Sequence, residues 1–530
     1  DKKLANETKL KARGGAWTDA EILEARRNLE KLYQGYGYPD IIISHRLQAT
    51  DNPGIADLVF VIDEGAKNEV RKIRFEGNAA FADVELRREM KTKQKGIFSW
   101  ITKSGRIDPG RLDEDLQSVT DFYRNNGYLR VSIDGVRRVP VKNGRVDLII
   151  PVNEGGLYKI QAVGFGKMTI FTSEELYPSL SLTVGQPYSL KKMRDDIRMI
   201  RSYYGSRGYA DAAVTPEIKD SGPGLVSIVY RVKEGSRYRV GRVNIEGNTR
   251  TQDRVVRREV PMKPGEYFNS VNVETTKKRL ENTNYFDPVQ VSGSASAQAG
   301  YRDLNIMLRE KQTGTISFGA GFSSIDNIVG YINLEQTNFD IMNPWRFTGG
   351  GQRFGMQLRL GSERRDFKVS LTEPWFLGKR LALGGELYYS DLAFLNDNYD
   401  EGRVGGAVFL RKPMGRKGYI KGEYRLENID IDVDTIPPFD YTGPGGIPDG
   451  VPDESLFTQE DGTYLRSAIS LTYVYDSRDS NVTPRKGSRV NLGVTLTGGV
   501  LGGDVDTYTF SASGSKHWSL PWDMILNLSG

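Results

Sequence analysis

The chain has 530 residues, with 73 Lys and Arg against 68 Asp and Glu, no Cys and two His, so several domains are expected, whereas disulfide scaffolds, Cys/His metal centres and Cys nucleophiles are not. Residues 1–313 carry 52 basic and 41 acidic side chains, while residues 314–530 carry 21 and 27, which indicates two different environments. Because the basic side chains of the first part are interleaved with acidic ones, a nucleic-acid partner is not expected.

The first 313 residues repeat one pattern. Three apolar stretches end in related phrases, Val-Ile-Asp-Glu-Gly, Val-Asn-Glu-Gly and Val-Lys-Glu-Gly, whose last residues are Gly65, Gly155 and Gly235. An amphipathic helix precedes each phrase and ends in Gly-Tyr, and a fourth helix ends in Asn-Tyr, at 37–38, 127–128, 208–209 and 284–285. Self-similarity at a spacing of 80 to 90 residues indicates tandem copies of one structural unit.

Each unit is predicted to follow the order β-α-α-β-β. In the first copy, Thr18 and Glu21 form a capping box in front of apolar residues at helical spacing. Two β-rich stretches follow each helix, and the strands at 70–78 and 240–248 precede short helices that contain Arg-Arg-Glu. The first copy lacks its opening strand and helix, so we expect the N-terminus to be truncated. The predicted domains are 1–66, an incomplete unit, then 67–156, 157–236, 237–313, and a second region, 314–530.

From Gly314 onward, apolar and polar residues alternate with a period of two, which is typical of β-strands. In the strand at 489–497, one face is entirely apolar and is predicted to contact lipid: Val490, Leu492, Val494 and Leu496. No apolar run reaches the 18 residues of a transmembrane helix, but short alternating strands are the pattern of a transmembrane barrel. Arg and Asn on the polar face favour a wet lumen over the packed core of a β-sandwich, and His517 is expected to line that lumen.

About eleven such strands fit between residue 314 and residue 530. A tight turn is predicted near Gly378-Lys379, and a long Pro-, Gly- and Asp-rich connection at 435–463. Because the eleventh strand, at 524–528, would leave an open edge in a membrane, we expect the natural protein to continue beyond it.

The first strand of this region is rich in glycine and is the candidate for a mobile edge. It comprises Gly314, Thr315, Ile316, Ser317, Phe318, Gly319, Ala320, Gly321 and Phe322. Glycine weakens strand pairing, so this strand could separate from a partner; equally, glycine could relieve the curvature of a barrel. The sequence leaves both interpretations open.

Acidic residues near the long connection suggest a calcium site: Asp430, Asp432, Asp434, Asp449, Asp453 and Glu454. The glycine that an EF-hand loop needs at its sixth position is Thr435 here, which favours an acidic extracellular loop. No catalytic constellation, metal site or cofactor site is predicted.

Several motifs, in this order and spacing, resemble the Omp85 superfamily, in which POTRA domains precede an outer-membrane barrel. They are the Glu-Gly-Asn strand ends within 74–78 and 243–248, the Gly-Tyr helix ends, Thr-Glu-Pro-Trp-Phe at 372–376 with the Leu-Gly-Lys-Arg segment after it, and Thr-Pro-Arg-Lys-Gly-Ser-Arg at 483–489. The resemblance implies an α+β class of tandem POTRA repeats followed by an antiparallel transmembrane β-barrel, of which this chain holds about eleven of roughly sixteen strands. The Arg-Gly-Phe motif and terminal aromatic strand of the family are missing, and would lie after Gly530.

The resemblance also implies a function and a location. Such proteins lie in the bacterial outer membrane with their repeats in the periplasm, which agrees with a chain without Cys. We expect a non-enzymatic factor that captures unfolded outer-membrane protein precursors at the sheet edges of its repeats and inserts them at a seam formed partly by 314–322. Arg257, Arg258 and Glu259 are expected either to contact an accessory outer-membrane lipoprotein or to form a solvated helix face. The alternatives are a protein-translocating channel of the same superfamily and, from another class, a barrel-anchored enzyme or adhesin.

Overall fold

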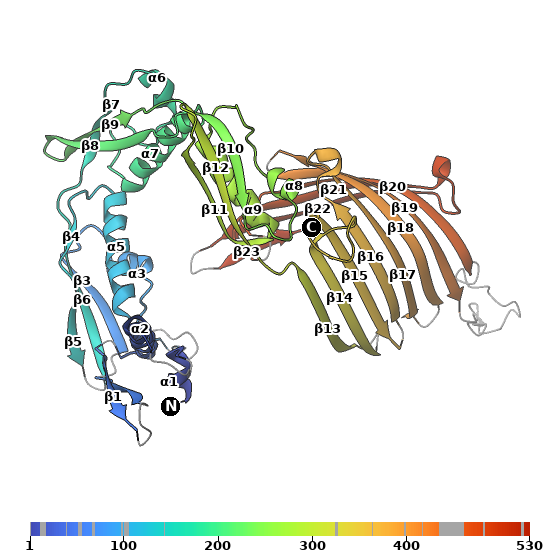
Figure 1. Ribbon diagram of the computed structural model, residues 1–530, viewed down its shortest axis with the longest axis horizontal. Coiled ribbons are helices and arrows are strands. Elements are labelled where there is room, and N and C mark those ends of the chain that lie inside the picture. The colour runs from blue at the N-terminus through green and yellow to red at the C-terminus, as the bar shows by residue number, and fades with distance from the viewer. Residues whose placement is uncertain are drawn as a thin grey trace, which may run out of the picture. The chain divides into compact units, whose positions relative to one another are not determined.

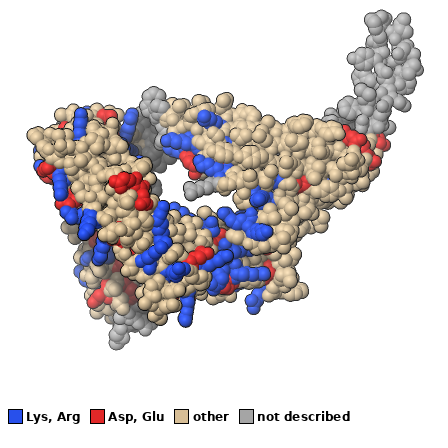
Figure 2. All heavy atoms as spheres, turned by 90° about the horizontal axis from the view of Figure 1, so that it is seen from above, with Lys and Arg blue, Asp and Glu red and all other residues tan. Residues whose placement is uncertain are grey.

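The chain divides into two compact units in a computed structural model, Asp1–Arg237 and Tyr238–Gly530. The structure describes residues 2–10, 17–38, 40–50, 56–65, 69–96, 99, 105, 107–141, 144–323, 327–362, 364–396, 399–415, 417–433, 461–480, 483–520 and 524–530. The last predicted repeat therefore belongs to the same compact unit as the large sheet. On the face seen in Figure 2, basic and acidic side chains are interspersed, with broad uncharged areas between them.

The first unit opens with helices α1 (Lys2–Glu7) and α2 (Asp19–Tyr36), followed by the antiparallel pair β1 (Ile42–Ala49) and β2 (Ala56–Asp63) (Figure 1). The predicted capping box is confirmed, because the amide of Thr18 donates to Glu21 Oε2 at 2.8 Å and the amide of Glu21 donates to Thr18 Oγ1 at 3.3 Å. Helix α2 ends at Gly37, whose φ of 98° lies in the left-handed region that glycine adopts without strain. No helix among the described residues is both long and apolar enough to cross a membrane.

Three further repeats confirm the predicted β-α-α-β-β order. The first of them consists of β3 (Glu69–Glu76), α3 (Asp83–Glu89), α5 (Pro109–Asn125), β4 (Ser132–Ile133), β5 (Arg137–Val141) and β6 (Arg145–Asn153). The next consists of β7 (Lys159–Phe165), α6 (Ser173–Leu176), α7 (Leu190–Gly205), β8 (Ala213–Gly222) and β9 (Leu225–Lys233). The last consists of β10 (Arg239–Glu246), α8 (Asp253–Arg257), α9 (Ser270–Thr283), β11 (Phe286–Ala295) and β12 (Tyr301–Glu310).

Each of these repeats has its own small sheet with the last strand in the centre. The orders are β3-β6-β4, with β5 also on β6, then β7-β9-β8 and β10-β12-β11. The central strand is parallel to the first strand and antiparallel to the second, and the two helices lie between the first and second strands in the chain. Apolar residues of the long helix pack on one face of the sheet, as Val119 of α5 does against Leu148 and Ile150 of β6.

The two edges of these sheets differ. The loop before the long helix pairs with the first strand: in the third repeat, Ile160 donates to Gln186 O at 2.9 Å, and in the fourth, Val240 donates to Glu266 O at 2.8 Å. The second strand, β8 or β11, pairs on one side with the central strand, and no other described strand lies on its outer side. Among the described residues of these two repeats, the β8 and β11 edges therefore present an unpaired ladder of backbone groups.

A glutamate at the end of the central strand holds the loop that follows the first strand. Glu154 accepts from the amide of Ala80 at 2.9 Å, and Glu234 accepts from the amide of Ile170 at 3.0 Å. The same two carboxylates accept the hydroxyls of Tyr123 and Tyr204, at 2.9 and 2.8 Å. Glu310 occupies this position in the last repeat. The glutamate of these Glu-Gly phrases thus joins the end of the central strand to the loop after the first strand by hydrogen bonds.

Eleven antiparallel strands follow in chain order and form one sheet (Figure 1). They are β13 (Gly314–Ser323), β14 (Asn327–Phe339), β15 (Gln352–Gly361), β16 (Arg364–Glu373), β17 (Ala382–Asn396), β18 (Tyr399–Met414), β19 (Gly418–Val433), β20 (Gly462–Asp476), β21 (Gly487–Thr497), β22 (Thr507–Ser519) and β23 (Ile525–Ser529). The predicted antiparallel barrel strands are confirmed, and β13 and β23 are the two edges of the described sheet.

The connections identify which end of the sheet lies near the last repeat. Strand β13 starts at Gly314, four residues after β12 ends at Glu310, so its first residue lies at the repeat end. Strand β16 ends and β17 starts at this same end. The two strands pair as the predicted hairpin, and their connection, predicted as a tight turn near Gly378-Lys379, spans 374–381 and includes a short helical turn at Phe376–Gly378. Strand β16 ends at Glu373, directly before Pro374, which has no N–H to donate to a strand ladder.

Candidate functional site: the first strand and its junction with the last repeat

Strand β13 forms an edge of the described sheet and pairs only with β14. Ile316, Phe318 and Phe322 alternate with small polar residues and glycines, and 68%, 81% and 78% of their surfaces are exposed. Within the described sheet, the outer backbone edge of β13 is unpaired and its apolar side chains are exposed, so the strand can pair with a further strand on that side.

The three glycines of β13 differ in their surroundings. A Cβ atom at Gly319 would lie 2.7 Å from the ring of Tyr331, its partner on β14, so the tyrosine ring covers this glycine. At Gly321 the nearest atom would be Val329 Cγ1 at 3.9 Å, which is an ordinary contact. A side chain at position 319 would therefore displace the ring of Tyr331, whereas a side chain at position 321 would meet only an ordinary contact.

Arg258, one of the predicted partner-binding residues, is instead buried against the end of the sheet. Its Nη1 lies 3.4 Å from Glu373 Oε1 at the end of β16, and its Nη2 donates to Gly351 O at 3.0 Å. Only 17% of its side chain is exposed. Burial lowers the pKa of the Arg258 guanidinium, and the carboxylate of Glu373 opposes that shift.

The neighbours of Arg258 point in different directions. Glu259 Oε1 accepts a hydrogen bond of 2.9 Å from Trp375 Nε1 in the β16–β17 connection. Arg257 forms a solvent-exposed pair with Asp253 on its own helix, with Nε 2.6 Å from Oδ2. Arg258 and Glu259 thus form contacts with other parts of the chain, whereas Arg257 stays accessible. Contact with an accessory lipoprotein stays a prediction.

A second set of contacts joins the last repeat to the connection between β14 and β15. Asn338 Nδ2 donates to Thr251 Oγ1 at 2.9 Å, and Asn338 Oδ1 accepts from the amide of Gly351 at 2.8 Å. Gln252 Nε2 donates to Asp340 Oδ2 at 2.6 Å. Asn338 and Thr251 are 2% and 3% exposed, so these bonds are shielded from water.

Glycine makes this close approach possible. A Cβ atom at Gly349 would overlap the backbone carbonyl of Arg250, and φ at Gly349 is 116°. A Cβ atom at Gly351 would overlap the guanidinium of Arg258. The run of three glycines at 349–351 was the sequence signal for this junction, because consecutive glycines mark a close approach of two backbones. We did not single it out from the sequence.

Glu310 lies where the last repeat passes into β13. It accepts from the amide of Thr251 at 2.6 Å and from Thr249 Oγ1 at 2.9 Å. Burial raises the pKa of this carboxyl, but the hydrogen bonds from Thr251, Thr249 and Arg250 outweigh burial, and the pKa is lowered overall. A polar pocket of about 290 Å³ beside it is lined by Glu310, Gly314, Gln336 and Asn338 among others.

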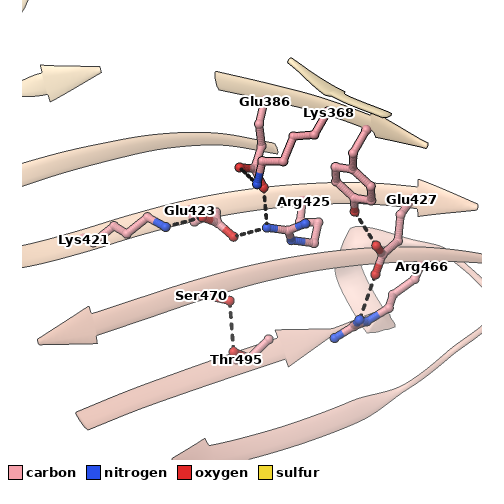
Figure 3. A network of polar contacts seen from close by, with 10 residues as sticks. Lys368, Glu386, Lys421, Glu423, Arg425, Glu427, Arg466, Ser470 and Thr495 are labelled. Carbon is pink, nitrogen blue, oxygen red and sulfur yellow. Dashed lines mark hydrogen bonds and ion pairs between the residues drawn. The ribbon is translucent and has the colours of Figure 1, made fainter. Parts of the chain in front are cut away.

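A network of ion pairs crosses the polar face of β16 to β20 (Figure 3). Glu386 on β17 accepts from Lys368 Nζ at 2.6 Å and from Arg425 Nη2 at 2.9 Å, and Arg425 also lies 3.0 Å from Glu423. Glu427, 3% exposed, accepts from Arg466 Nη1 at 2.8 Å and from the hydroxyl of Tyr388. These contacts join side chains of β16, β17, β19 and β20 and reach across β18, so the wall from β16 to β20 is cross-linked on this face, whereas β13 has no charged side chain.

The other sequence predictions fall on the two faces as follows. Val490, Leu492, Val494 and Leu496 are 36–48% exposed on the apolar face. His517 shares the polar face with Ser513, to which Asn491 Nδ2 donates at 3.0 Å, and is 9% exposed. Contact of the four apolar residues with lipid stays a prediction. Of the acidic residues, Asp430 accepts from Thr463 Oγ1 at 2.6 Å, while Asp434, Thr435, Asp449, Asp453 and Glu454 lie outside the described residues.

Known families match most of the chain. The model of the Omp85 superfamily domain matches residues 346–530. The POTRA model, described as a surface antigen variable number repeat, matches residues 68–155, 158–235 and 238–311. The solved structure of BamA from Haemophilus ducreyi lacking POTRA domains 1–3 is similar in fold, with a TM-score of 0.50 and 21% identity, over 69% of this chain and 68% of that one.

Two curated relatives share a name. The outer membrane protein assembly factor BamA of Nitratidesulfovibrio vulgaris is 24% identical over 502 residues, which cover 93% of this chain and 60% of the relative. The protein of the same name from Neisseria meningitidis is 27% identical over 376 residues, which cover 70% of this chain and 46% of the relative. The chain thus spans about half to three fifths of the length of these relatives.

Proposed function

Because the chain belongs to the Omp85 superfamily, with POTRA repeats in front of its outer-membrane barrel domain, we propose that it assembles other β-barrel proteins in the outer membrane. The repeats lie in the periplasm. In this proposal they capture unfolded precursors, and β13 templates their strands into the bilayer. The process needs no catalytic residue, since strand pairing and burial in the membrane supply the free energy.

The observation that carries this proposal is the composition and pairing of β13, a glycine-rich strand without charged side chains that pairs with β14 alone in the described sheet. Its partner β14 is held to the last repeat through Asn338 and Thr251, while the wall from β16 to β20 is cross-linked by ion pairs. The outer edge of β13 has only backbone groups to offer. A strand of a precursor could therefore add to β13 without disturbing the rest of the sheet.

The free β8 and β11 edges of the repeats support the capture step. Their outer backbone groups can pair with an extended chain of any sequence, because main-chain hydrogen bonds carry the affinity. The first strands have less edge to offer, since the loops before the long helices already pair with their first residues. We therefore place capture on β8 and β11.

Arg257 is the remaining candidate for contact with an accessory lipoprotein. Its side chain is 49% exposed, so a charged partner could reach it. A charge at the rim of such an interface would act mainly on orientation and association rate. Arg258 and Glu259 would act indirectly, by holding α8 against the sheet.

The experiment is a reversible lock on the seam. In the natural full-length protein, a Cys at Ser317 is paired with a Cys on the strand that closes the barrel against β13. Oxidation should stop the assembly of reporter barrels, and reduction should restore it. Residues 1–530 contain no Cys that would interfere.

The matched control is a disulfide within the fixed wall. Phe367 and Tyr389 face each other on β16 and β17, so Cys residues at these positions form a cross-link away from the seam. This variant should assemble reporter barrels normally in both redox states. Normal assembly by the locked seam would exclude templating by β13.

A further inference from the structure

The face of the sheet opposite the ion-pair network contains a large apolar groove. It has a volume of about 910 Å³ and is formed by β16 to β20. Gly385 and Gly406 lie at its centre, and its apolar walls include Leu371, Leu387, Val408, Tyr424, Leu426 and Leu465. Ligand pockets in proteins range from roughly 300 to 1,000 Å³, so this groove has room for a sizeable ligand.

Strand register places these residues on one face. Leu387 is opposite Gly406 across β17 and β18, and Val408 is opposite Gly385. Tyr424 of β19 is opposite Val408. Because side chains alternate between faces, this set lies on the other side of the sheet from Glu386 and Arg425. Leu387 and Val408 are 69% and 56% exposed, so the groove opens outward.

The surroundings of Gly385 would tolerate a side chain, and the absence of one leaves the space of the groove. A Cβ atom there would meet only Ala407 O, at 3.6 Å, which is an ordinary contact. No close backbone approach requires glycine at this position. The missing side chain therefore leaves space on the face rather than relieving a clash.

Cationic side chains lie beyond the end of the groove that is nearer the last repeat, where the charged residue of the lining on this face, Glu373, is paired with Arg258. Lys412 is on the same face of β18 as Val408 and Leu410, about 13 Å beyond Val408 at the rise of a β-strand. Lys379 and Arg380 are exposed in the β16–β17 connection at this end. The surface thus has an apolar groove with positive charge beyond its end, on the side of the sheet where the last repeat lies.

We propose that this groove binds a phospholipid, with acyl chains along Gly385 and Gly406 and the phosphate near Lys412. The outer face of a membrane-spanning sheet lies against hydrocarbon, and the cations complement an anionic headgroup. Since bulk lipid is as apolar as the groove, shape and the headgroup contact, rather than the hydrophobic effect, retain this lipid. The proposal goes beyond the assembly function and does not depend on it.

The test uses the natural full-length protein in lipid nanodiscs that contain phosphatidylglycerol with a diazirine on an acyl chain. After photolysis, peptide mass spectrometry locates the adducts. Adducts should concentrate on Leu387, Val408 and Tyr424 relative to the apolar strand face at 490–496. Gly385→Leu should fill the groove and lower this labelling several-fold.

Gly422→Leu is the matched control. Gly422 is opposite Leu410 on the same face but outside the groove, and a Cβ atom there would meet nothing within 4 Å. This variant should label like the unmodified protein. If Gly385→Leu does not fold, as judged by heat-modifiable electrophoretic mobility, Val408→Phe fills the groove from its wall and replaces it.

Two further arms identify the ligand. Lys412→Glu should weaken labelling by the phosphatidylglycerol probe, because it places a negative charge beside the phosphate. Lipid A with the same diazirine should not label the groove. Uniform labelling of the apolar face, unchanged labelling in the filled variant, or preferential labelling by lipid A would overturn the proposal.

Discussion

Trp375 Nε1 donates a hydrogen bond of 2.9 Å to Glu259 Oε1, which joins the connection between β16 and β17 to the end of α8 in the last repeat. The two residues are 116 positions apart in the chain. With the ion pair between Arg258 and Glu373, this bond fixes the last repeat on the sheet at a point three strands away from β13. The last repeat is thereby held at the end of β16, and none of these contacts involves β13.

Arg258→Ala should loosen this junction by about 1–3 kcal/mol. Removing one partner of a fully buried pair costs about 3–5 kcal/mol, and the loss is smaller here because Glu373 keeps partial contact with water. Hydrogen exchange of peptides 340–351 and 373–381 measures the change. Arg257→Ala is the control, since its exposed pair with Asp253 is worth less than about 0.5 kcal/mol. Equal effects of the two variants would contradict the burial argument.

Acidification should release the loop that Glu310 holds. The pKa of Glu310 is lowered in the folded protein, so its stabilising contribution is complete above the unfolded pKa of about 4.3 and is lost as the pH falls through the lower folded pKa. Exchange of the Thr251 amide, corrected for its intrinsic rate, should therefore accelerate below about pH 4. Glu310→Gln should remove this pH response, whereas Glu274→Gln, in an exposed pair with Lys278, should keep it. A response that survives in Glu310→Gln would assign it to another group.

Tyr123→Phe and Tyr204→Phe should each destabilise their own repeat by about 1–2 kcal/mol, because each leaves a carboxylate without a buried hydroxyl donor. Burial raises the pKa of both tyrosines, so the hydroxyls remain donors across the neutral range. Pulse proteolysis in urea reports the unfolding of the repeats. Tyr203→Phe removes an exposed hydrogen bond to Glu175 and should cost clearly less. Similar losses of stability in all three variants would indicate that the hydrogen bonds to Glu154 and Glu234 stabilise the repeats no more than an exposed one does.

Val494→Arg should cost about 2–4 kcal/mol if this position lies near the middle of the bilayer. Thr495→Arg should be tolerated better, because Thr495 Oγ1 lies 2.9 Å from Ser470 Oγ on the polar face (Figure 3). The measurement is reversible folding of both variants into lipid bilayers. The opposite order of stabilities would reverse the assignment of the two faces.

The sequence alone was sufficient for the architecture, because its signals are local and repeated. The capping box at Thr18 and the Gly-Tyr helix ends recur at fixed spacing, so helix boundaries and the unit order could be read without contacts. The alternation from Gly314 onward likewise predicted antiparallel strands with one apolar face. It also singled out β13, whose glycines are visible in the sequence.

The environment of the candidate site was decided by tertiary structure. Arg258 and Glu259 have the sequence pattern of a solvated helix face, and only the approach of Glu373 and Trp375, more than 110 residues later, buries them. Sequence could not separate the roles of Gly319 and Gly321, because the ring that covers Gly319 comes from the neighbouring strand. It also could not show which sheet edges of the repeats are free. Burial, register and edge pairing depend on residues distant in the chain, whereas helix caps and strand alternation depend on neighbours, and this difference in range separates what was predicted from what was not.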